Sequence, residues 1–177
     1  MIYLKAGGQK FLKIVHLICA ALWIGSAFSM LIVLFLGTPE NGNQLYMRSY
    51  ALKLIDDLIL IPGAIGCLVT GLIYSIFTKW GFFRHKWIIV KWIMTVAQIS
   101  FGTFALGPWI NNNVILAARL GEAALTDPAV LHNLSMSKTW GTIQALLLLI
   151  YLVVSVQKPW RSIKAQSQTS NKKGAAI

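Results

Sequence analysis

The sequence predicts an all-α fold, a bundle of four transmembrane helices embedded in a lipid bilayer. The 177 residues are 56% hydrophobic and only 12% charged, which is too apolar for a soluble domain of this size. Four apolar segments reach or approach the roughly 20 residues that a membrane-spanning helix needs. The basic residues gather at alternate ends of these segments, which indicates a fixed orientation in the bilayer.

Hydropathy sets the expected bounds of the helices. We expect residues 1–160 to form one transmembrane domain with helices at about 11–36, 52–78, 86–110 and 130–157. The first segment is too long for the core of a signal peptide, so we expect the protein to retain it.

The connections between these helices carry their own signals. The turn residues of "GTPENGN" separate the first helix from the second, and Pro62 is expected to kink the second helix. The stretch "VILAARLGEAAL" is expected to form a short interfacial helix, and "TDPAV" looks like the start of the last helix. Residues 161–177 are polar and basic and are expected to be a disordered cytoplasmic tail.

The net charge of +11 favours contact with lipid head groups over nucleic acid. Twelve of the sixteen basic residues lie on the side of the membrane that would hold both chain ends, and the acids lie on or near the other. The positive-inside bias therefore predicts that both termini are cytoplasmic, in an N-in/C-in topology. The expected partners are the bilayer and its anionic head groups, with no nucleic acid. Assembly into a homo-oligomer is compatible with this composition.

Each expected helix carries a stripe of small and polar residues, a pattern typical of contacts between helices in membranes. The four stripes are His16, Ala20, Trp23, Ala27 and Met30; Asp56, Gly63, Gly66, Thr70 and Tyr74; Lys91, Thr95, Gln98 and Gly102; and Gly141, Gln144, Tyr151 and Ser155. Thr70, Gln98 and Gln144 are costly to leave in lipid, so we expect them to face the bundle interior.

Two ionisable residues on these stripes are the main candidates for a site. His16 lies about five residues into the first helix, roughly 8 Å deep at 1.5 Å per residue, and Lys91 lies at a similar depth on the third helix. Ionisable residues inside a membrane are functional candidates by default. Lys91 is also close enough to the surface to snorkel, and His16 is equally able to hydrogen-bond across the bundle.

A haem b would suit this arrangement, because haem iron takes a neutral imidazole as axial ligand and bundle interiors host cofactors. His16 would then ligate the iron, and Lys91 would serve as the second ligand or as the partner of a propionate. The alternative is a non-enzymatic membrane protein without a cofactor, a small transporter or an assembly subunit. In that case His16 and Lys91 serve packing or proton transfer.

The remaining candidates carry weaker signals. His85 sits at the membrane boundary, and His132 is expected on the opposite side of the membrane from His16. Of Asp56 and Asp57, we expect one to pair with Lys53 or Arg48 and the other to face the interior. The two cysteines, Cys19 and Cys67, have no metal-ligand spacing and are expected to be small core residues.

In the order and spacing of four stretches, the sequence resembles a bacterial group of four-helix integral membrane proteins of unknown function. That group is similar in pattern to the four-helix core of the CopD (copper-resistance D) and HemJ proteins. These stretches are "KFLKIVHLICAALWIGS", "DDLILIPGAIGCLVTGLIY", "WIIVKW" and "YLVVSVQKPW". The resemblance covers about Lys10 to Trp160 and implies a place in the bacterial inner membrane.

HemJ-type proteins are haem-linked oxidoreductases that act on a porphyrinogen, with a histidine on the first helix and a lysine on the third. His16 and Lys91 match those positions, so the resemblance implies that they bind the haem. HemJ proteins also carry an Asn-Glu-Pro motif at the start of the last helix. Here that stretch reads "LHNLSMSKTWG", without the glutamate. The resemblance therefore extends to haem or porphyrin handling more directly than to the oxidase reaction.

Overall fold

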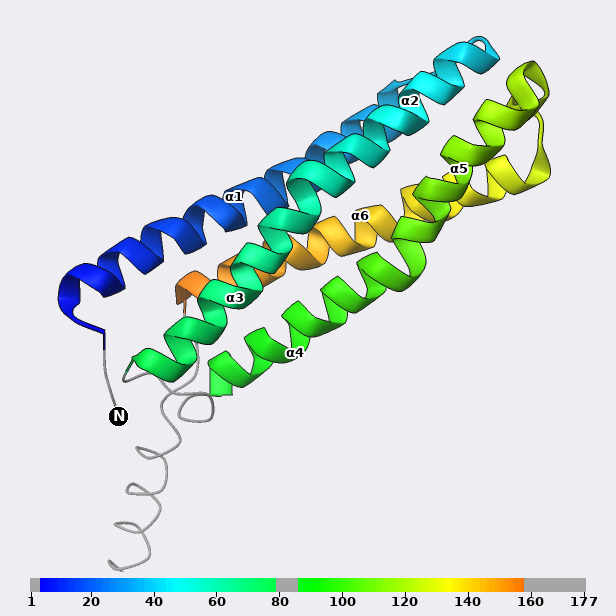
Figure 1. The fold of residues 1–177 in the computed structure, drawn as a ribbon. Coiled ribbons are helices and arrows are strands. Elements are labelled where there is room, and N and C mark those ends of the chain that lie inside the picture. The colour runs from blue at the N-terminus through cyan, green and yellow to red at the C-terminus, as the bar shows by residue number, and fades with distance from the viewer. Residues whose placement is uncertain (1–3, 79–85, 158–177) are drawn as a thin grey trace, which may run out of the picture.

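Four long apolar helical spans make up the computed structural model, which describes residues 4–78 and 86–157 (Figure 1). The spans are Ala6–Leu36, Gly42–Phe77, Ile88–Leu125 and Pro128–Gln157, and each is long and apolar enough to cross a membrane. The described residues contain no strand. The predicted all-α bundle of four transmembrane helices is confirmed.

The spans run up and down, which defines two ends of the bundle. At the end that we call the terminal end, α1 (Ala6–Leu36) begins and α6 (Pro128–Gln157) ends (Figure 1). A hydrogen bond from the Leu4 N–H to the Phe77 carbonyl ties the start of the chain to the end of the second span there. At the opposite end, which we call the far end, α1 finishes and α6 begins.

The second span consists of α2 (Gly42–Ile55), a π-helical turn η1 (Asp56–Leu60) and α3 (Ile61–Phe77). It begins ten residues before the expected start at residue 52. The side chain of Asn41 caps it by accepting a hydrogen bond from the Gln44 N–H at 2.9 Å. Cap chemistry and packing at the far end, rather than hydropathy, therefore set the start of this helix.

The third span consists of α4 (Lys86–Phe101), a second π-helical turn η2 (Gly102–Leu106) and α5 (Gly107–Leu120), followed by a 3₁₀ turn η3 (Gly121–Leu125). The expected separate interfacial helix is instead the continuation of this span beyond residue 110. Helix α5 buries one face against α2, and that contact stabilises the extension.

The fourth span, α6, begins at Pro128, two residues before the expected start. The Asp127 carboxylate accepts hydrogen bonds from the Ala129 and Val130 N–H groups at 3.0 and 3.1 Å, which caps the helix. The tail predicted at 161–177 lies outside the described residues, as does His85.

Glycines permit the closest contacts between helices. Gly63 of α3 lies against the backbone of α1, where an added Cβ would come within 2.8 Å of the Trp23 nitrogen. At the far end, Gly42 lies against the backbone of Gly121, whose φ of +55° favours glycine. The Gly42 N–H donates to the Glu122 carboxylate at 3.0 Å. The second span therefore packs closely against α1 at Gly63 and against the α5–η3 connection at Gly42.

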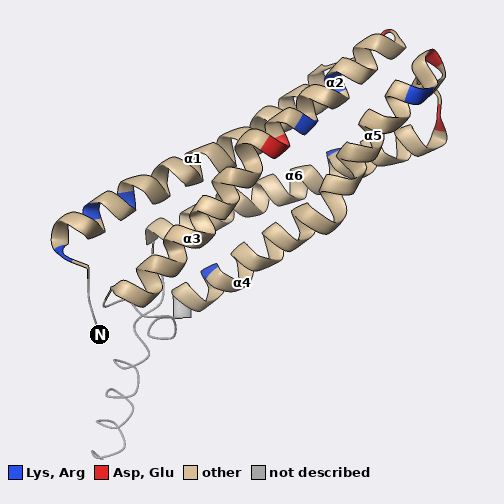
Figure 2. Ribbon diagram, in the orientation of Figure 1, with Lys and Arg blue, Asp and Glu red and all other residues tan. Residues whose placement is uncertain are grey.

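The outer surface of the bundle is apolar over much of its length. Large side chains such as Phe11 and Phe104 are 69% and 81% exposed, which suits lipid rather than water. Carboxylates are confined to the middle of the bundle and its far end among the described residues (Figure 2). The protein is therefore a multi-pass membrane protein.

Candidate functional site

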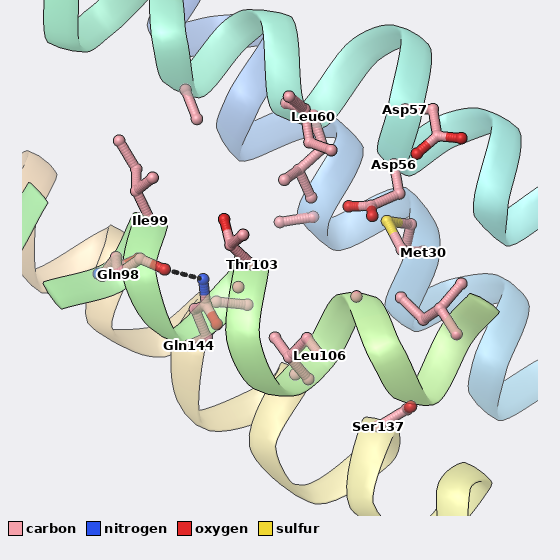
Figure 3. A pocket seen from close by; sticks show the side chains of 18 of the residues that line it. Met30, Asp56, Asp57, Leu60, Gln98, Ile99, Thr103, Leu106, Ser137 and Gln144 are labelled. Atoms are coloured by element: carbon pink, nitrogen blue, oxygen red, sulfur yellow. Dashed lines mark hydrogen bonds between the residues drawn. The ribbon is translucent and has the colours of Figure 1, made fainter. Parts of the chain in front are cut away.

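A pocket of about 360 Å³ lies inside the bundle, near the middle of its length, and all four spans line it (Figure 3). This volume is in the range of small-molecule sites in proteins. Most of the wall is apolar, with Met30 of α1, Leu60 of η1 and Leu106 of η2 among the lining residues. The pocket therefore offers an apolar compartment inside the membrane protein, with a few polar groups at fixed positions.

The polar groups form two separate ends of this pocket. Figure 3 shows the Asp56 carboxyl beside the Met30 sulfur at one end and the amides of Gln98 and Gln144 at the other. Gln144 Nε2 donates to the main-chain carbonyl of Gln98 at 3.1 Å. The Oε1 atoms of both glutamines are buried and have no hydrogen-bond partner among the described residues.

Unpaired buried oxygens are costly, because they lose water without gaining a donor. Gln98 is only 6% exposed, and Ser137 of α6, which also lines the pocket, is 3% exposed with an unpaired hydroxyl. Three such atoms around one compartment indicate that something other than protein completes their hydrogen bonds.

Asp56 and Asp57 have different surroundings, as the sequence predicted. Lys53 Nζ pairs with Asp57 Oδ2 at 2.6 Å, four residues apart on the same helix. No hydrogen bond or ion pair joins the side chain of Asp56 to another described residue, and its carboxyl lies at the pocket. One acid is thus neutralised by its neighbour, and the other is presented to the interior.

Two π-helical turns lie on opposite walls of the pocket, each just before a proline. The Ile61 N–H donates to the carbonyl of Asp56, five residues earlier, and the Gly107 N–H donates likewise to Gly102. Pro62 and Pro108 follow directly, and each lacks the N–H that an α-helix requires. At Pro62, where the sequence predicts a kink, the structure has a π turn. Single π turns are frequent at functional sites.

A ladder of three hydrogen bonds joins α4 to α6 between the terminal end and the pocket. Lys91 Nζ donates to Ser155 Oγ at 2.8 Å, and Thr95 Oγ1 donates to the Tyr151 hydroxyl at 3.2 Å. The third rung is the bond from Gln144 to Gln98. The polar stripes predicted on these two helices therefore face each other, and the expected inward positions of Thr70, Gln98 and Gln144 are confirmed.

His16 is held in a single orientation by Thr70 of α3. Thr70 Oγ1 lies 2.6 Å from His16 Nδ1 and 2.6 Å from the Gly66 carbonyl oxygen; when the hydroxyl donates its only proton to that carbonyl, its oxygen accepts from His16 Nδ1–H. The neutral imidazole then keeps its lone pair on Nε2. Histidines that bind metals usually donate their other ring N–H in this way, so His16 has the features of an Nε2 ligand.

Lys91 of α4 interacts electrostatically with His16 of α1. Its Nζ donates a hydrogen bond to Ser155 of α6. Its Nζ also lies 5.2 Å from the centre of the Tyr151 ring, over the ring face. A hydroxyl acceptor and an aromatic face are the surroundings of an ammonium group. This geometry favours the role of an anion partner over that of an iron ligand.

The sequence-predicted His16 site and the pocket are separate. Ala27 is the first lining residue on α1 after His16, eleven residues or about 16 Å further along the helix. His132 is exposed at the far end, and the two cysteines form no disulfide, with Cys67 in the core. The described residues contain no group of three His, Cys, Asp or Glu side chains that could hold a metal ion.

Several pocket residues were not singled out from the sequence. Thr103 points into the pocket from η2, and Ser137 lines it from α6 (Figure 3). The Gly-Pro pair at Gly107 and Pro108, inside an apolar run, was the signal that could have located η2. The sequence matches no protein-family model and no curated protein, and the structure matches no solved structure.

Proposed function

We propose that the protein is a small, non-enzymatic transporter that binds a largely apolar molecule with hydrogen-bond donors inside the bilayer. The observation that carries this proposal is the pocket of about 360 Å³ with two unpaired glutamine oxygens at one end. A ligand that supplies N–H or O–H donors to Gln98 and Gln144 would satisfy both oxygens. The apolar wall would contribute by burying the body of the same ligand.

The two π turns support movement of the ligand as well as binding. They lie on adjacent spans at the level of the pocket, and both interrupt the regular α-helical hydrogen bonds there. Interrupted helices form the central substrate sites of many membrane transporters, and one part of the bundle then moves against the other around that site. We propose that the far-end helices α2 and α5 move together relative to α3 and α4, with the two π turns as the hinges.

Binding can be tested with aminoanthracene, a fluorescent apolar molecule that carries an N–H donor. The purified protein in lipid nanodiscs should show saturable binding above that of empty nanodiscs. Thr103→Phe fills the pocket from a side chain that points into it, and should weaken binding at least about tenfold. Val96→Phe is the control, because Val96 is 51% exposed and does not line the pocket.

Equal affinity of the wild type and Thr103→Phe would place the dye elsewhere and overturn the proposal. So would the absence of any saturable signal above empty nanodiscs. Uptake of the dye into sealed vesicles then separates a transporter from a protein that only binds.

A second candidate, haem or porphyrin binding, is favoured by one specific observation, the hydrogen bond between His16 Nδ1 and the Thr70 hydroxyl at 2.6 Å, whose Nδ1–H form has the ring lone pair on Nε2. In this proposal His16 would hold the iron of a haem b, and Lys91 would pair with a propionate. A bound haem would supply one-electron redox chemistry. The residues of this chain would fix the imidazole through Thr70 and provide the cation.

The absorbance spectrum of the purified protein tests this second candidate. His16→Ala should abolish a b-type spectrum, and Lys91→Met should weaken haem retention because it removes the charge and keeps the bulk. His132→Ala is the control, because that residue is exposed at the far end. A protein that is colourless from haem-supplemented cells and takes up no haem on titration would remove this candidate.

We further propose that the protein lies in the bacterial inner membrane with its terminal end in the cytoplasm. The positive-inside bias supports this orientation, because most of the basic residues belong to that end. The same residues would contact anionic lipid head groups. A reporter fused at Asn43, in the first turn of α2, should be detected outside the cell. Detection inside the cell would reverse the orientation.

A further inference from the structure

Asp56 is an unpaired carboxylate at a pocket that already contains unsatisfied polar groups. Its neighbour Asp57 is neutralised by Lys53, and the Asp56 carboxyl has no hydrogen bond or ion pair with the other described residues. Two further polar groups at the pocket lack a partner among the described residues, since Gln98 and Ser137 are more than nine-tenths buried and each has an unpaired oxygen. Asp56, Gln98 and Ser137 line one compartment.

Two charged side chains, those of Lys53 and Asp57, act on the Asp56 carboxyl. Helix α2 contributes Lys53, which is engaged by Asp57, and η1 contributes Asp57 itself. The residues that α1 and α3 contribute to the pocket are apolar and include Met30 and Ala64. An ionised Asp56 would therefore face an apolar compartment without a dedicated counter-charge, which is unfavourable unless a proton or a cation neutralises it.

We propose that the pocket selects an organic monocation, a protonated amine with an apolar body, and that this amine exchanges with a proton on Asp56. This inference rests on the proposed function, because it names the charge of the ligand that the pocket holds. The ammonium group lies at Asp56, and a hydroxyl or amide donor at the other end of the ligand meets Gln98 and Gln144. The body of the ligand packs on the apolar wall between them.

The exchange is balanced in atoms and charge. The Asp56 carboxylic acid loses its proton to water, and the carboxylate then pairs with the ammonium of the ligand. No bond within the ligand breaks, and the net charge is the same on both sides of the step. A proton and an ammonium cannot both neutralise one carboxylate, so each excludes the other. A membrane protein with such a site couples the movement of the amine in one direction to the movement of a proton in the other.

Calorimetric titration tests the exchange with a matched pair of probes. One probe is an aminobutyl phenol, which is cationic, and the other is the hydroxybutyl phenol, which has the same shape and no charge. Titration in two buffers with different enthalpies of ionisation gives the number of protons released for each ligand bound. Nanodiscs of zwitterionic lipid prevent the amine from binding to anionic head groups.

The wild type should bind the amine more tightly than the alcohol and release up to one proton per amine, with none released by the alcohol. Asp56→Asn should weaken binding of the amine at least about tenfold and abolish proton release, because it removes a charge-assisted hydrogen bond. The same variant should keep its affinity for the alcohol, which shows that the pocket is intact. Glu40→Gln, which changes an exposed acid in the α1–α2 connection, is the control and should behave as the wild type.

Two results would overturn the inference in distinguishable ways. Equal affinity for amine and alcohol, without proton release and without an effect of Asp56→Asn, would refute the exchange and leave the proposed function standing. The absence of binding of either probe to the wild type would refute both.

Discussion

Replacement of Gly63 by alanine should destabilise the protein because α1 and α3 touch there through their backbones. A Cβ at Gly63 would lie 2.8 Å from the Trp23 nitrogen and 3.0 Å from the Cys19 carbonyl oxygen. Both neighbours are backbone atoms of α1, so no side-chain rotation can relieve the contact. The two helices must instead move apart over their whole interface.

The expected magnitude follows from a comparison with Gly71→Ala on the same helix. No atom lies within 4 Å of the added Cβ at Gly71. Both substitutions gain the same helix propensity, at most about 1 kcal/mol, and this gain cancels in their difference. The remaining difference is the cost of overpacking, about 1–3 kcal/mol. For a chain of this length that cost lowers Tm by about 2–4 °C for each kcal/mol.

Thermal unfolding of both variants in the same nanodiscs measures this difference directly. Gly63→Ala should unfold several degrees below Gly71→Ala, and Gly71→Ala should unfold at or slightly above the wild-type temperature. A Tm for Gly63→Ala equal to or above that of Gly71→Ala would contradict the close backbone contact between α1 and α3.

Two further predictions concern buried hydrogen bonds. Asn113→Leu should destabilise the protein by about 1 kcal/mol or more, because Asn133 Nδ2 donates to Asn113 Oδ1 at 3.1 Å in a buried site. The double replacement by leucine should recover part of that loss in a thermal double-mutant cycle, and strict additivity would argue against the pair. Thr70→Val should shift the ¹⁵N signals of the His16 ring away from the Nδ1–H tautomer, whereas Thr95→Val should not. An unchanged His16 spectrum in Thr70→Val would refute the assigned hydrogen bond.

Hydropathy and helical periodicity were sufficient to predict the four spans and the inward faces of their polar stripes. In the membrane interior, an uncharged polar group such as Gln98 has no partner in lipid and must face another helix. This constraint predicts that the polar stripes of α4 and α6 face the interior, but it does not predict which residues pair across them. It was also predictable that one of Asp56 and Asp57 would pair with a basic neighbour, because Lys53 precedes them by three and four residues. The spacing did not indicate that the partner would be Asp57.

The far end was harder to predict, since it is held by contacts that hydropathy does not measure. Helix α2 begins at Gly42 because Asn41 caps it and because Leu45 packs against α5 and η3. The continuation of α5 to Leu120 depends on the same packing. Neither segment is apolar enough to be recognised as part of a span, so their extent is set by tertiary contact.

The pocket itself could not be predicted from the sequence. Its walls come from all four spans, and its shape depends on how the two π turns change the direction of the second and third spans. A proline in an apolar segment indicates an interruption of the helix, but it does not indicate which neighbouring side chains will surround the interruption. Residues such as Thr103 and Ser137 acquire their positions only through that geometry.

Photoaffinity labelling tests most directly whether the pocket is a binding site. The probe is a trifluoromethyl phenyldiazirine that carries an aminomethyl group, and mass spectrometry of the digested protein locates its adducts. Adducts should concentrate on pocket residues such as Leu60, Thr103 and Leu106, and an excess of the unlabelled amine should suppress them. Adducts spread over lipid-facing residues such as Ile93 and Phe104, and unchanged by the competitor, would show that the molecule enters the lipid around the bundle and that the pocket does not bind it.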